Sequence, residues 1–160
     1  MSVSGIEGTE ARLRLHPTKD LGERSYLLGS RLYIGARDAA RLDSCTTARL
    51  KGLCTVRLYG RDAAGALSAE AITGHAGAAP DSAAPTIQWV PANNCADCTV
   101  MIPGPLLEEG HVDGASMRVS RGLIESFAMR LDQHEVVQLE RFGFCILDDK
   151  EAMRFIFITR

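Results

Sequence analysis

The feature that most constrains the fold of this chain is a succession of short segments in which apolar and polar residues alternate. ARLRLH at 11–16 alternates without a break, and SRLYIG at 30–35 carries the Tyr and Ile typical of strands. A period of two places apolar side chains on one face of an extended segment, so it predicts half-buried β-strands. Further runs of this kind lie at 47–60, with a break near Gly52, and at 86–90, 98–102, 117–125, 136–147 and 154–159.

Helical periodicity is restricted to ARDAARL at 36–42 and SFAMRLDQH at 126–134, each long enough for about two turns. Many short strands punctuated by Gly and Pro, with few short helices, predict an all-β fold of the barrel or sandwich kind. Residues 72–85, between the two halves of the chain, are mostly Ala, Gly, Ser and Pro. Such a segment has few side chains to bury, so we expect a flexible connection there.

The overall charge excludes a globally basic protein. The net charge of the 160 residues is −2, so contact with nucleic acid requires a local basic patch. Of the 18 basic residues only three are lysine. The excess of arginine is explained by the codon usage of a GC-rich genome as well as by RNA binding. The sequence shows no apolar signal segment at its start and no run of the roughly 18–20 apolar residues that span a membrane. We therefore expect a cytoplasmic protein whose five cysteines are reduced.

Candidate catalytic and metal-binding motifs are weak. Cys95 and Cys98 form a CxxC pair, but a structural zinc site needs four ligands and a second pair of similar spacing is not found. The sequence has no Gly-rich phosphate loop of Walker or Rossmann type. It also has no Ser/His/Asp or paired-carboxylate pattern typical of catalysis. We expect a chain that is non-catalytic by itself and binds neither metal nor cofactor.

VVQLERFGFCILDD at 136–149 places Gln138 and Arg141 in a segment otherwise patterned as a strand. Solubility would require only Lys or Glu at such positions. Gln and Arg are the side chains best shaped for paired hydrogen bonds to the edge of a nucleobase. This segment is therefore the first candidate for contact with RNA.

Several stretches together resemble, in the same order, motifs of archaeal and eukaryotic glutamyl-tRNA synthetases and their glutaminyl relatives. RLRLHPTKDLGERSYLLGSRLYIGARDAARL at 12–42 is similar to a block HP-x-K…G-x-R…(V/I)-x-I…D-A…L, and ARLKGLCTVRL at 48–58 to the block that follows it. TIQWVPANN at 86–94 and VVQLERFGFCILDD are similar to the I-x-W-V-P and V-V-Q-F-E-R-F-G-F motifs. The final FIFITR resembles the closing strand, so the resemblance extends from Arg12 to Arg160.

This resemblance implies the C-terminal anticodon-binding region of a class I glutamyl-tRNA synthetase. In that family the region consists of two small tandem β-barrels, with a distal barrel inserted into a proximal one. On this chain the distal barrel is expected at 16–77. The proximal barrel is expected at 3–15 together with 86–160, and residues 72–85 would cross between the barrels.

The same resemblance implies the residues that contact RNA. Gln138 and Arg141 match positions that face the anticodon loop, and Arg41 and Lys51 match basic positions of the distal blocks. Arg49 and Arg160 are further candidates for RNA contacts. Because residues three apart on a strand point to opposite faces, Gln138 and Arg141 imply an irregular strand.

The implied partners are the anticodon stem-loop of tRNA-Glu, extending to tRNA-Gln in a non-discriminating enzyme, and the catalytic domain of the parent synthetase. Neither DNA nor a membrane is implied, and ATP and Mg²⁺ are expected only with that catalytic domain. Thr55 replaces an Asn of the family pattern, and 72–85 is less basic than its family counterpart. The alternatives are a free-standing RNA-binding or assembly protein on the same barrels, as in a ribosomal protein that binds 5S rRNA, and a protein-interaction domain that has lost RNA binding.

Overall fold

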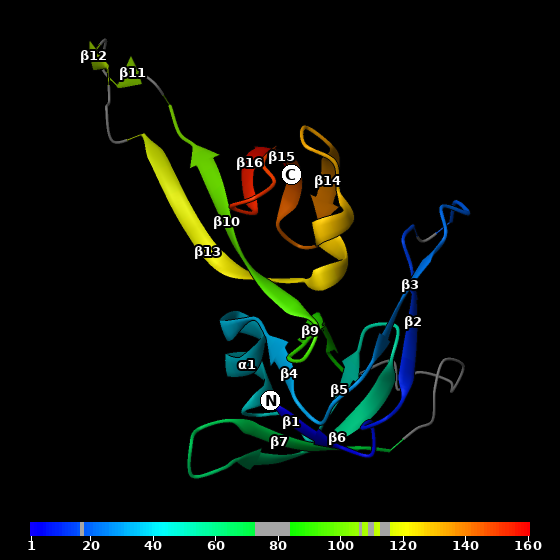
Figure 1. The fold of residues 1–160 in the computed structure, drawn as a ribbon. Helices are drawn as coiled ribbons and strands as arrows, with labels where there is room; N and C mark the ends of the chain where they lie inside the picture. The colour runs from blue at the N-terminus through cyan, green and yellow to red at the C-terminus, as the bar shows by residue number, and fades with distance from the viewer. Residues whose placement is uncertain (17, 73–83, 106, 109–110, 113–115) are drawn as a thin grey trace. The chain divides into compact units, whose positions relative to one another are not determined.

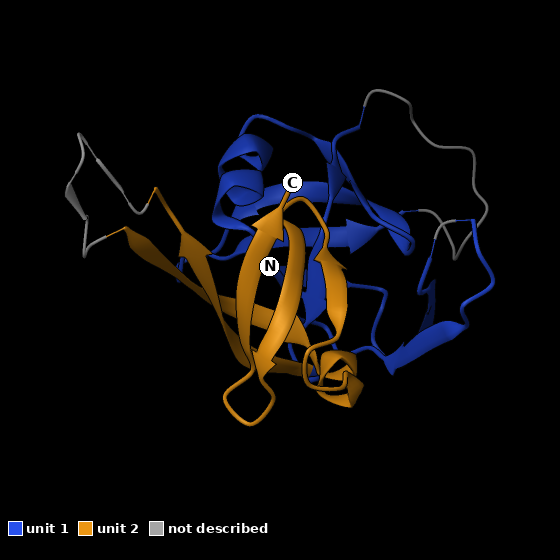
Figure 2. Cartoon of the chain, turned by 90° about the horizontal axis from the view of Figure 1, so that it is seen from above, with its two compact units in different colours: residues 1–94 blue, residues 95–160 orange. Residues whose placement is uncertain are grey.

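The computed structural model describes residues 1–16, 18–72, 84–105, 107–108, 111–112 and 116–160. It divides into two compact units, residues 1–94 and residues 95–160, which Figure 2 colours separately. Each unit has its own five-stranded sheet. Residues 73–83 of the predicted flexible connection lie outside the described residues, so that expectation stays a prediction.

The larger sheet of the first unit has the strand order β1-β7-β6-β5-β8 (Figure 1). Its strands are β1 (Ser2–Ser4), β5 (Thr47–Leu50), β6 (Cys54–Arg61), β7 (Leu67–Ala71) and β8 (Thr86–Ile87). The β1–β7 and β5–β8 pairs are parallel, and the β5–β6 and β6–β7 pairs are antiparallel. The unit also holds the hairpin of β2 (Glu10–Arg14) and β3 (Glu23–Leu27), the pair of β4 (Leu32–Ile34) and β9 (Trp89–Pro91), and helix α1 (Ala36–Leu42).

The core of the first unit is built from alternate positions of its strands. In β5 the side chains of Ala48 and Leu50 are buried while their neighbours are partly exposed, as the period of two predicts. Burial of a large aliphatic side chain contributes about 1.5–3 kcal/mol, so these positions supply much of the stability of the unit. The largest fully buried side chains of the unit are Val3, Leu32, Leu42, Leu50, Val56, Ile87 and Pro91.

The sheet of the second unit has the order β13-β10-β16-β15-β14. Its strands are β10 (Cys95–Pro103), β13 (Met117–Glu125), β14 (Val136–Leu139), β15 (Gly143–Asp149) and β16 (Arg154–Thr159). A short pair, β11 (Leu107–Glu108) and β12 (His111–Val112), lies between β10 and β13 along the chain, and a 3-10 helix follows at Ser126–Arg130. One face of the sheet packs a core of Val100, Ala128, Cys145, Leu147, Met153 and Phe155.

The all-β prediction is confirmed: strands dominate both units, and α1 is the α-helix of the described residues. It occupies the predicted residues 36–42. The break predicted near Gly52 is also confirmed, since a turn there separates β5 from β6. The second predicted helix is shorter than expected, because only Ser126–Arg130 is helical, as a 3-10 helix. No helix in the described part of the chain is long and apolar enough to cross a membrane.

The prediction of a single irregular strand at 136–147 is wrong. The chain forms a hairpin, in which β14 ends at Leu139 and β15 begins at Gly143. Arg141 lies in the turn with a φ of 63°, in the left-handed region, and the N–H of Phe142 donates to the carbonyl of Leu139 at 2.9 Å. The reversal satisfies backbone groups that would be left unpaired by an irregular single strand.

The assignment to a distal and a proximal barrel stays a prediction. Hydrogen bonds join the described strands into open sheets, and β1 and β2, which we expected in the proximal barrel, pair with β7 and β3 inside the first unit. Compact units defined by their contacts need not coincide with the barrels of a family. Barrel closure and the boundaries at residues 16 and 77 are therefore left as expectations.

Candidate nucleic-acid interface

The residues implied for RNA contact fall in both units. Arg41, Arg49 and Lys51 belong to the first unit, on α1, on β5 and in the turn after β5. Gln138, Arg141 and Arg160 belong to the second, on β14, in the β14–β15 turn and directly after β16. These residues thus divide into two sets, one in each unit, and the surroundings of each residue are described below.

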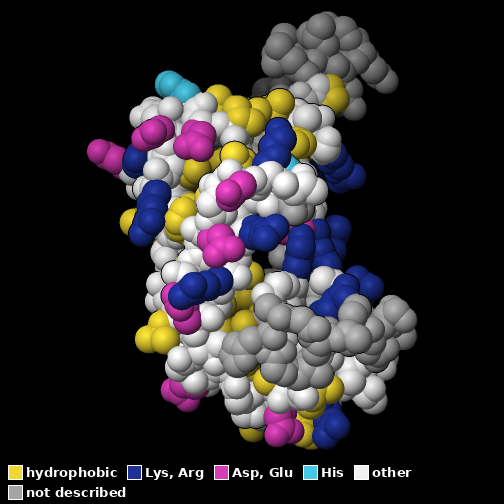
Figure 3. Space-filling model, turned by 90° about the vertical axis from the view of Figure 1, so that its right-hand side faces the viewer, with side chains coloured by type: hydrophobic (Ala, Val, Ile, Leu, Met, Phe, Trp, Pro, Cys, Tyr) yellow, Lys and Arg dark blue, Asp and Glu magenta, His cyan; other side chains and the backbone are white. Residues whose placement is uncertain are grey.

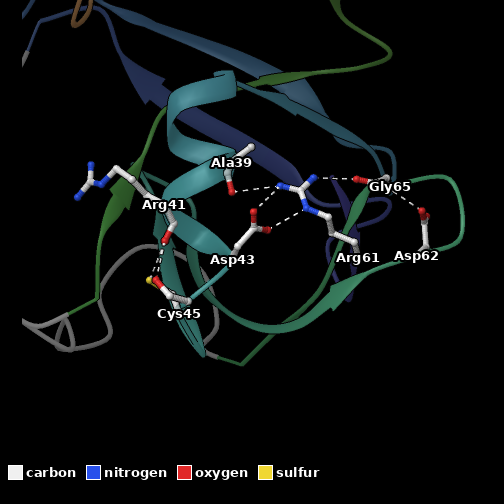
Figure 4. Close-up of polar contacts among 9 residues, drawn as sticks. Ala39, Arg41, Asp43, Cys45, Arg61, Asp62 and Gly65 are labelled. Carbon is white, nitrogen blue, oxygen red and sulfur yellow. Dashed lines mark hydrogen bonds and ion pairs between the residues drawn. The ribbon is translucent and has the colours of Figure 1, made fainter.

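Arg41 projects from the last turn of α1 with its side chain 64% exposed. One guanidinium nitrogen lies 3.7 Å from a carboxylate oxygen of Asp38, one helical turn earlier. In Figure 4 the guanidinium of Arg41 points away from the Arg61–Asp43 contacts, while its backbone carbonyl accepts a hydrogen bond from the thiol of Cys45. An ion pair this long and this exposed contributes little, so the guanidinium can exchange it for a phosphate or a base.

Arg61 holds the helix that carries Arg41. It donates to both carboxylate oxygens of Asp43 at 2.8 and 3.1 Å, to the carbonyl of Gly65 at 2.8 Å and to that of Ala39 at 3.4 Å (Figure 4). Its pKa is raised, first by the hydrogen bond to Asp43. These contacts tie the end of α1 to the β6–β7 connection. The network joins positions 18 residues apart, and sequence reasoning did not identify it.

Arg49 is occupied by a contact inside the first unit. Its Nε and one Nη donate to the hydroxyl of Thr86 at 3.1 and 2.7 Å, and its backbone N–H donates to the carbonyl of Pro85 at 2.9 Å. Arg49 and Thr86 are register partners in the parallel β5–β8 pair. The structure therefore gives this half-buried arginine a role in attaching β8, which makes it a weaker candidate for RNA contact than Lys51.

The backbone of Lys51 is held on both sides by the segment 86–90. Its N–H donates to the carbonyl of Ile87 at 3.0 Å, and its carbonyl accepts from the indole N–H of Trp89 at 3.0 Å. The next residue, Gly52, has a φ of 71°, and a Cβ there would lie 2.7 Å from a methyl carbon of Leu13. The positive φ favours glycine at this position, and the two hydrogen bonds hold the backbone from which the exposed Lys51 side chain starts.

The β14–β15 hairpin presents Gln138 on the sheet face opposite the core. Val137 and Leu139 pack against the core, and Gln138 is exposed between them, in register with Phe144 of β15. Arg141 is exposed in the turn. The neighbouring Phe142 anchors that turn, because its ring meets Phe157 edge to face with centroids 5.9 Å apart.

Gly143 makes the turn possible. Its φ is 144°, and a Cβ built there would lie 2.5 Å from the carbonyl oxygen of Thr159 and 2.6 Å from the ring of Phe157. Both neighbours belong to β16, so the hairpin lies directly against that strand. The sequence FGF is therefore a packing requirement at the end of the turn that carries Arg141, while Gln138 lies on β14, one residue before that strand ends.

Asp148 and Asp149, at the end of β15, form ion pairs with Arg154 of the same unit. Arg154 donates to the carboxylate of Asp148 through Nε at 2.8 Å and Nη at 2.7 Å, and lies 3.6 Å from Asp149. The hydrogen bond to Asp148 raises the pKa of Arg154. Both carboxylates lie at the end of β15 far from the turn. Because they are paired with Arg154, they repel an approaching polyanion less than unpaired acids would.

The CxxC pair does not form a chelating site. Cys95 and Cys98 are register partners of Glu125 and Gly122 on β13, and their odd spacing on a strand sends them to opposite faces. Cys98 packs against the core of the second unit, and burial raises the pKa of its thiol. No group of three or more His, Cys, Asp or Glu side chains suited to a metal was found within the described ranges. The metal-free state itself stays a prediction.

The surface carries charges of both signs. In Figure 3, Lys and Arg side chains are interspersed with Asp and Glu side chains over the visible face. This agrees with the net charge of −2 and with the absence of a globally basic field. Binding to RNA would therefore depend on a small number of placed side chains.

Comparison with known proteins gives the family. Two sequence models described as "tRNA synthetases class I (E and Q), anti-codon binding domain" match this chain, one at residues 1–73 and the other at residues 86–148. The two matches flank the segment predicted to connect the halves of the chain. They cover Arg41, Lys51, Gln138 and Arg141 but end before Arg160.

Relatives with curated names are archaeal glutamate–tRNA ligases. The protein of Cenarchaeum symbiosum is 32% identical over 147 residues, which are 91% of this chain and 25% of the relative. Those of Methanosarcina acetivorans and Hyperthermus butylicus are 29% and 30% identical over 92% and 95% of this chain, and 23% and 25% of the relatives. The chain thus spans about a quarter of the length of the relatives it matches. It belongs to the anticodon-binding domains of the class I tRNA synthetases for glutamate and glutamine.

Proposed function

We propose that this chain binds the anticodon stem-loop of tRNA-Glu as part of a glutamate–tRNA ligase. The observation that carries the proposal is the hairpin of the second unit, where a matched anticodon-binding segment presents Gln138 from strand β14 and Arg141 from the turn that follows it. Single-stranded loops expose the Watson–Crick edges of their bases, and an amide and a guanidinium can each form paired hydrogen bonds to such edges.

The two sets of residues have different proposed roles. Gln138 and Arg141 read bases, because their side chains carry directional donors and acceptors. Lys51 and Arg41 add contacts to phosphates or to neighbouring bases, since an ammonium acts as a point charge and the Arg41 ion pair is weak. Arg160 is a further candidate in the second unit, whereas the contact of Arg49 with Thr86 favours a structural role for that arginine.

The ligase activity belongs to the proposal as well. The parent protein would use ATP and Mg²⁺ in a catalytic domain outside these 160 residues, and this chain would position the tRNA for glutamylation in the cytoplasm. The curated relatives are about four times as long as this chain, which supports such an arrangement. The isolated chain is expected to show no ATP–pyrophosphate exchange.

The test is a comparison of two tRNAs. Binding of tRNA-Glu and of the same tRNA with a swapped anticodon should be measured for the wild type and for Arg141→Ala. The wild type should prefer tRNA-Glu, and Arg141→Ala should lose about 1–3 kcal/mol of binding free energy together with most of the preference. Arg130→Ala is a matched control, because Arg130 is exposed on the 3-10 helix and lies over the ring of Phe127 at 5.0 Å. Equal binding of both tRNAs by wild type and mutant would refute the base-reading role.

A further inference from the structure

Phe144 is an aromatic side chain placed beside the amide of Gln138 without a role in the core. The two residues are direct register partners in the antiparallel β14–β15 pair. Register partners in such a pair project to the same face, with Cβ atoms about 4.5–5.5 Å apart. Gln138 and Phe144 are both exposed, while the alternate residues Val137 and Cys145 pack into the core on the other face.

The exposure of Phe144 is not an edge effect of a frayed strand. Phe144 also has a register partner in β16, Thr159, so it lies on a strand paired on both sides, with a shift of the β15–β16 register between Phe144 and Cys145. Its side chain is nevertheless 39% exposed, and Val136 and Ile158 on the flanking strands are 54% and 51% exposed. Single exposed apolar residues are common on soluble proteins, but a ring next to a polar amide on an ordered strand has the geometry of a contact site.

The surroundings of Phe144 select the kind of partner. At one end of the hairpin the turn carries the exposed Arg141, and Arg160 directly follows Thr159. The acids of β15, Asp148 and Asp149, lie toward its other end and are paired with Arg154, and one acid of the turn, Glu140, is adjacent to Arg141. A flat ring, an edge-reading amide and nearby guanidinium groups match the chemistry of an unpaired nucleotide, which has an aromatic face, a polar edge and a phosphate.

We infer that Phe144 is a stacking platform for an unpaired base of the RNA, and that Gln138 reads the edge of a base on this platform. The inference rests on the proposed function and extends it to a residue outside the set implied by the resemblance. The anchored turn supports such a platform, since Gly143 is packed against Thr159 and Phe142 against Phe157. A platform that does not move loses little conformational entropy when the base binds.

The experiment compares ring-retaining and ring-removing variants. The probe is the anticodon stem-loop of tRNA-Glu, with a fluorescent pyrimidine analogue replacing one anticodon base at a time. Phe144→Leu keeps an apolar side chain but removes the aromatic face, and it should weaken binding about 5- to 150-fold, the range expected for loss of one stacked base. Phe144→Tyr and Phe144→Trp keep an aromatic face and should bind within about threefold of the wild type.

The fluorescence supplies a readout that a purely structural role would not change. Stacking on Phe144 should quench the pyrimidine analogue at one anticodon position in the wild type and in Phe144→Trp, and the quenching should be lost in Phe144→Leu. Val136→Ala is the matched control, because Val136 is exposed on the same face and has no ring. Its binding and quenching should equal those of the wild type. Circular dichroism melts of all variants should coincide closely, since Phe144 is not part of the core cluster.

Each alternative outcome is distinct. Wild-type binding to both the stem-loop and tRNA-Glu with no loss in Phe144→Leu would overturn the inference and leave the proposed function standing. Equal losses in Phe144→Leu and Val136→Ala, with concentration-dependent sedimentation, would show that this face joins copies of the chain, and would also overturn it. Failure of the wild type to bind either RNA would overturn the proposed function and the inference together.

Discussion

The indole N–H of Trp89 donates a hydrogen bond of 3.0 Å to the backbone carbonyl of Lys51. Trp89 is buried, and it reaches Lys51 from 38 residues further along the chain. Together with the hydrogen bond from Lys51 to the carbonyl of Ile87, it fixes the turn between β5 and β6. The position of Lys51, a candidate for RNA contact, therefore depends on Trp89, which is not itself a candidate for RNA contact.

Trp89→Phe should destabilise the first unit and weaken the contribution of Lys51 to binding. The substitution removes the indole donor from a partly buried carbonyl, at a cost of about 1 kcal/mol, measured as the free energy of urea unfolding by circular dichroism. Ile87→Val is the control, because it keeps both hydrogen bonds and should cost about 0.5–1.5 kcal/mol. In a double-mutant cycle on tRNA affinity, Lys51→Ala should cost less in the Trp89→Phe background than in the wild type. Additive effects would contradict the coupling.

Gly143→Ala should be more destabilising than Gly60→Ala. Both glycines have positive φ, 144° and 94°, but a Cβ meets backbone and ring atoms at Gly143 and no atom within 4 Å at Gly60. The left-handed conformation alone costs about 1–2 kcal/mol, and overpacking adds about 1–3 kcal/mol at Gly143. The free energies of unfolding of Gly143→Ala and Gly60→Ala, each compared with that of the wild type, test this prediction. Equal losses would show that the contact with β16 is relieved at little cost.

Lys51→Ala should weaken all tRNAs about equally and lower the salt dependence of binding. Loss of one phosphate contact reduces the slope of log K against log salt by about 1. Titrations at about 50 and about 200 mM salt measure this slope. Arg61→Ala is a useful comparison, because the Arg61 guanidinium is engaged with Asp43, Ala39 and Gly65. It should lower the melting temperature while leaving the slope unchanged well below that temperature.

Stability should fall at alkaline pH. Burial raises the pKa values of Cys54 and Cys98, and burial together with the nearby Cys98 raises that of Cys145. Because these folded-state pKa values are raised, the thiols contribute stability that is complete below their unfolded pKa and is lost as the pH rises through the folded one. Melting temperatures from about pH 7.5 to pH 10.5 should therefore decline, and more gently in Cys98→Ala. An unchanged decline in that variant would contradict the assignment.

The pattern of apolar and polar residues predicted those elements whose conformation depends on residues close in sequence. The alternation in β5 and β6, the turn near Gly52 and helix α1 all depend on residues close in sequence. The β14–β15 turn was missed because VVQLERFGFC contains no Asn-Gly or Asp-Gly signal. An arginine in the left-handed region opposes local preference, and the packing of Phe142 on Phe157 overrides it.

The candidate site was predictable only as a set of residue types. Motif resemblance pointed to Lys51 and Arg49, but their different environments depend on Trp89 and Thr86, which lie 38 and 37 residues away. Phe144 was not identified from the sequence, because its significance comes from the register of a hairpin that the pattern did not reveal.

The parallel pairing of β5 with β8 has a consequence for synthesis of the protein. Arg49 and Leu50 pair with Thr55 and Cys54 of β6 on one side of β5, but their partners on the other side are Thr86 and Ile87. This edge of β5 therefore stays open until residues 86–87 have left the ribosome. Closing so long a loop is entropically costly and slows folding. A nascent chain ending at residue 73 would expose the β5 edge, and would be a preferred target for proteases and chaperones.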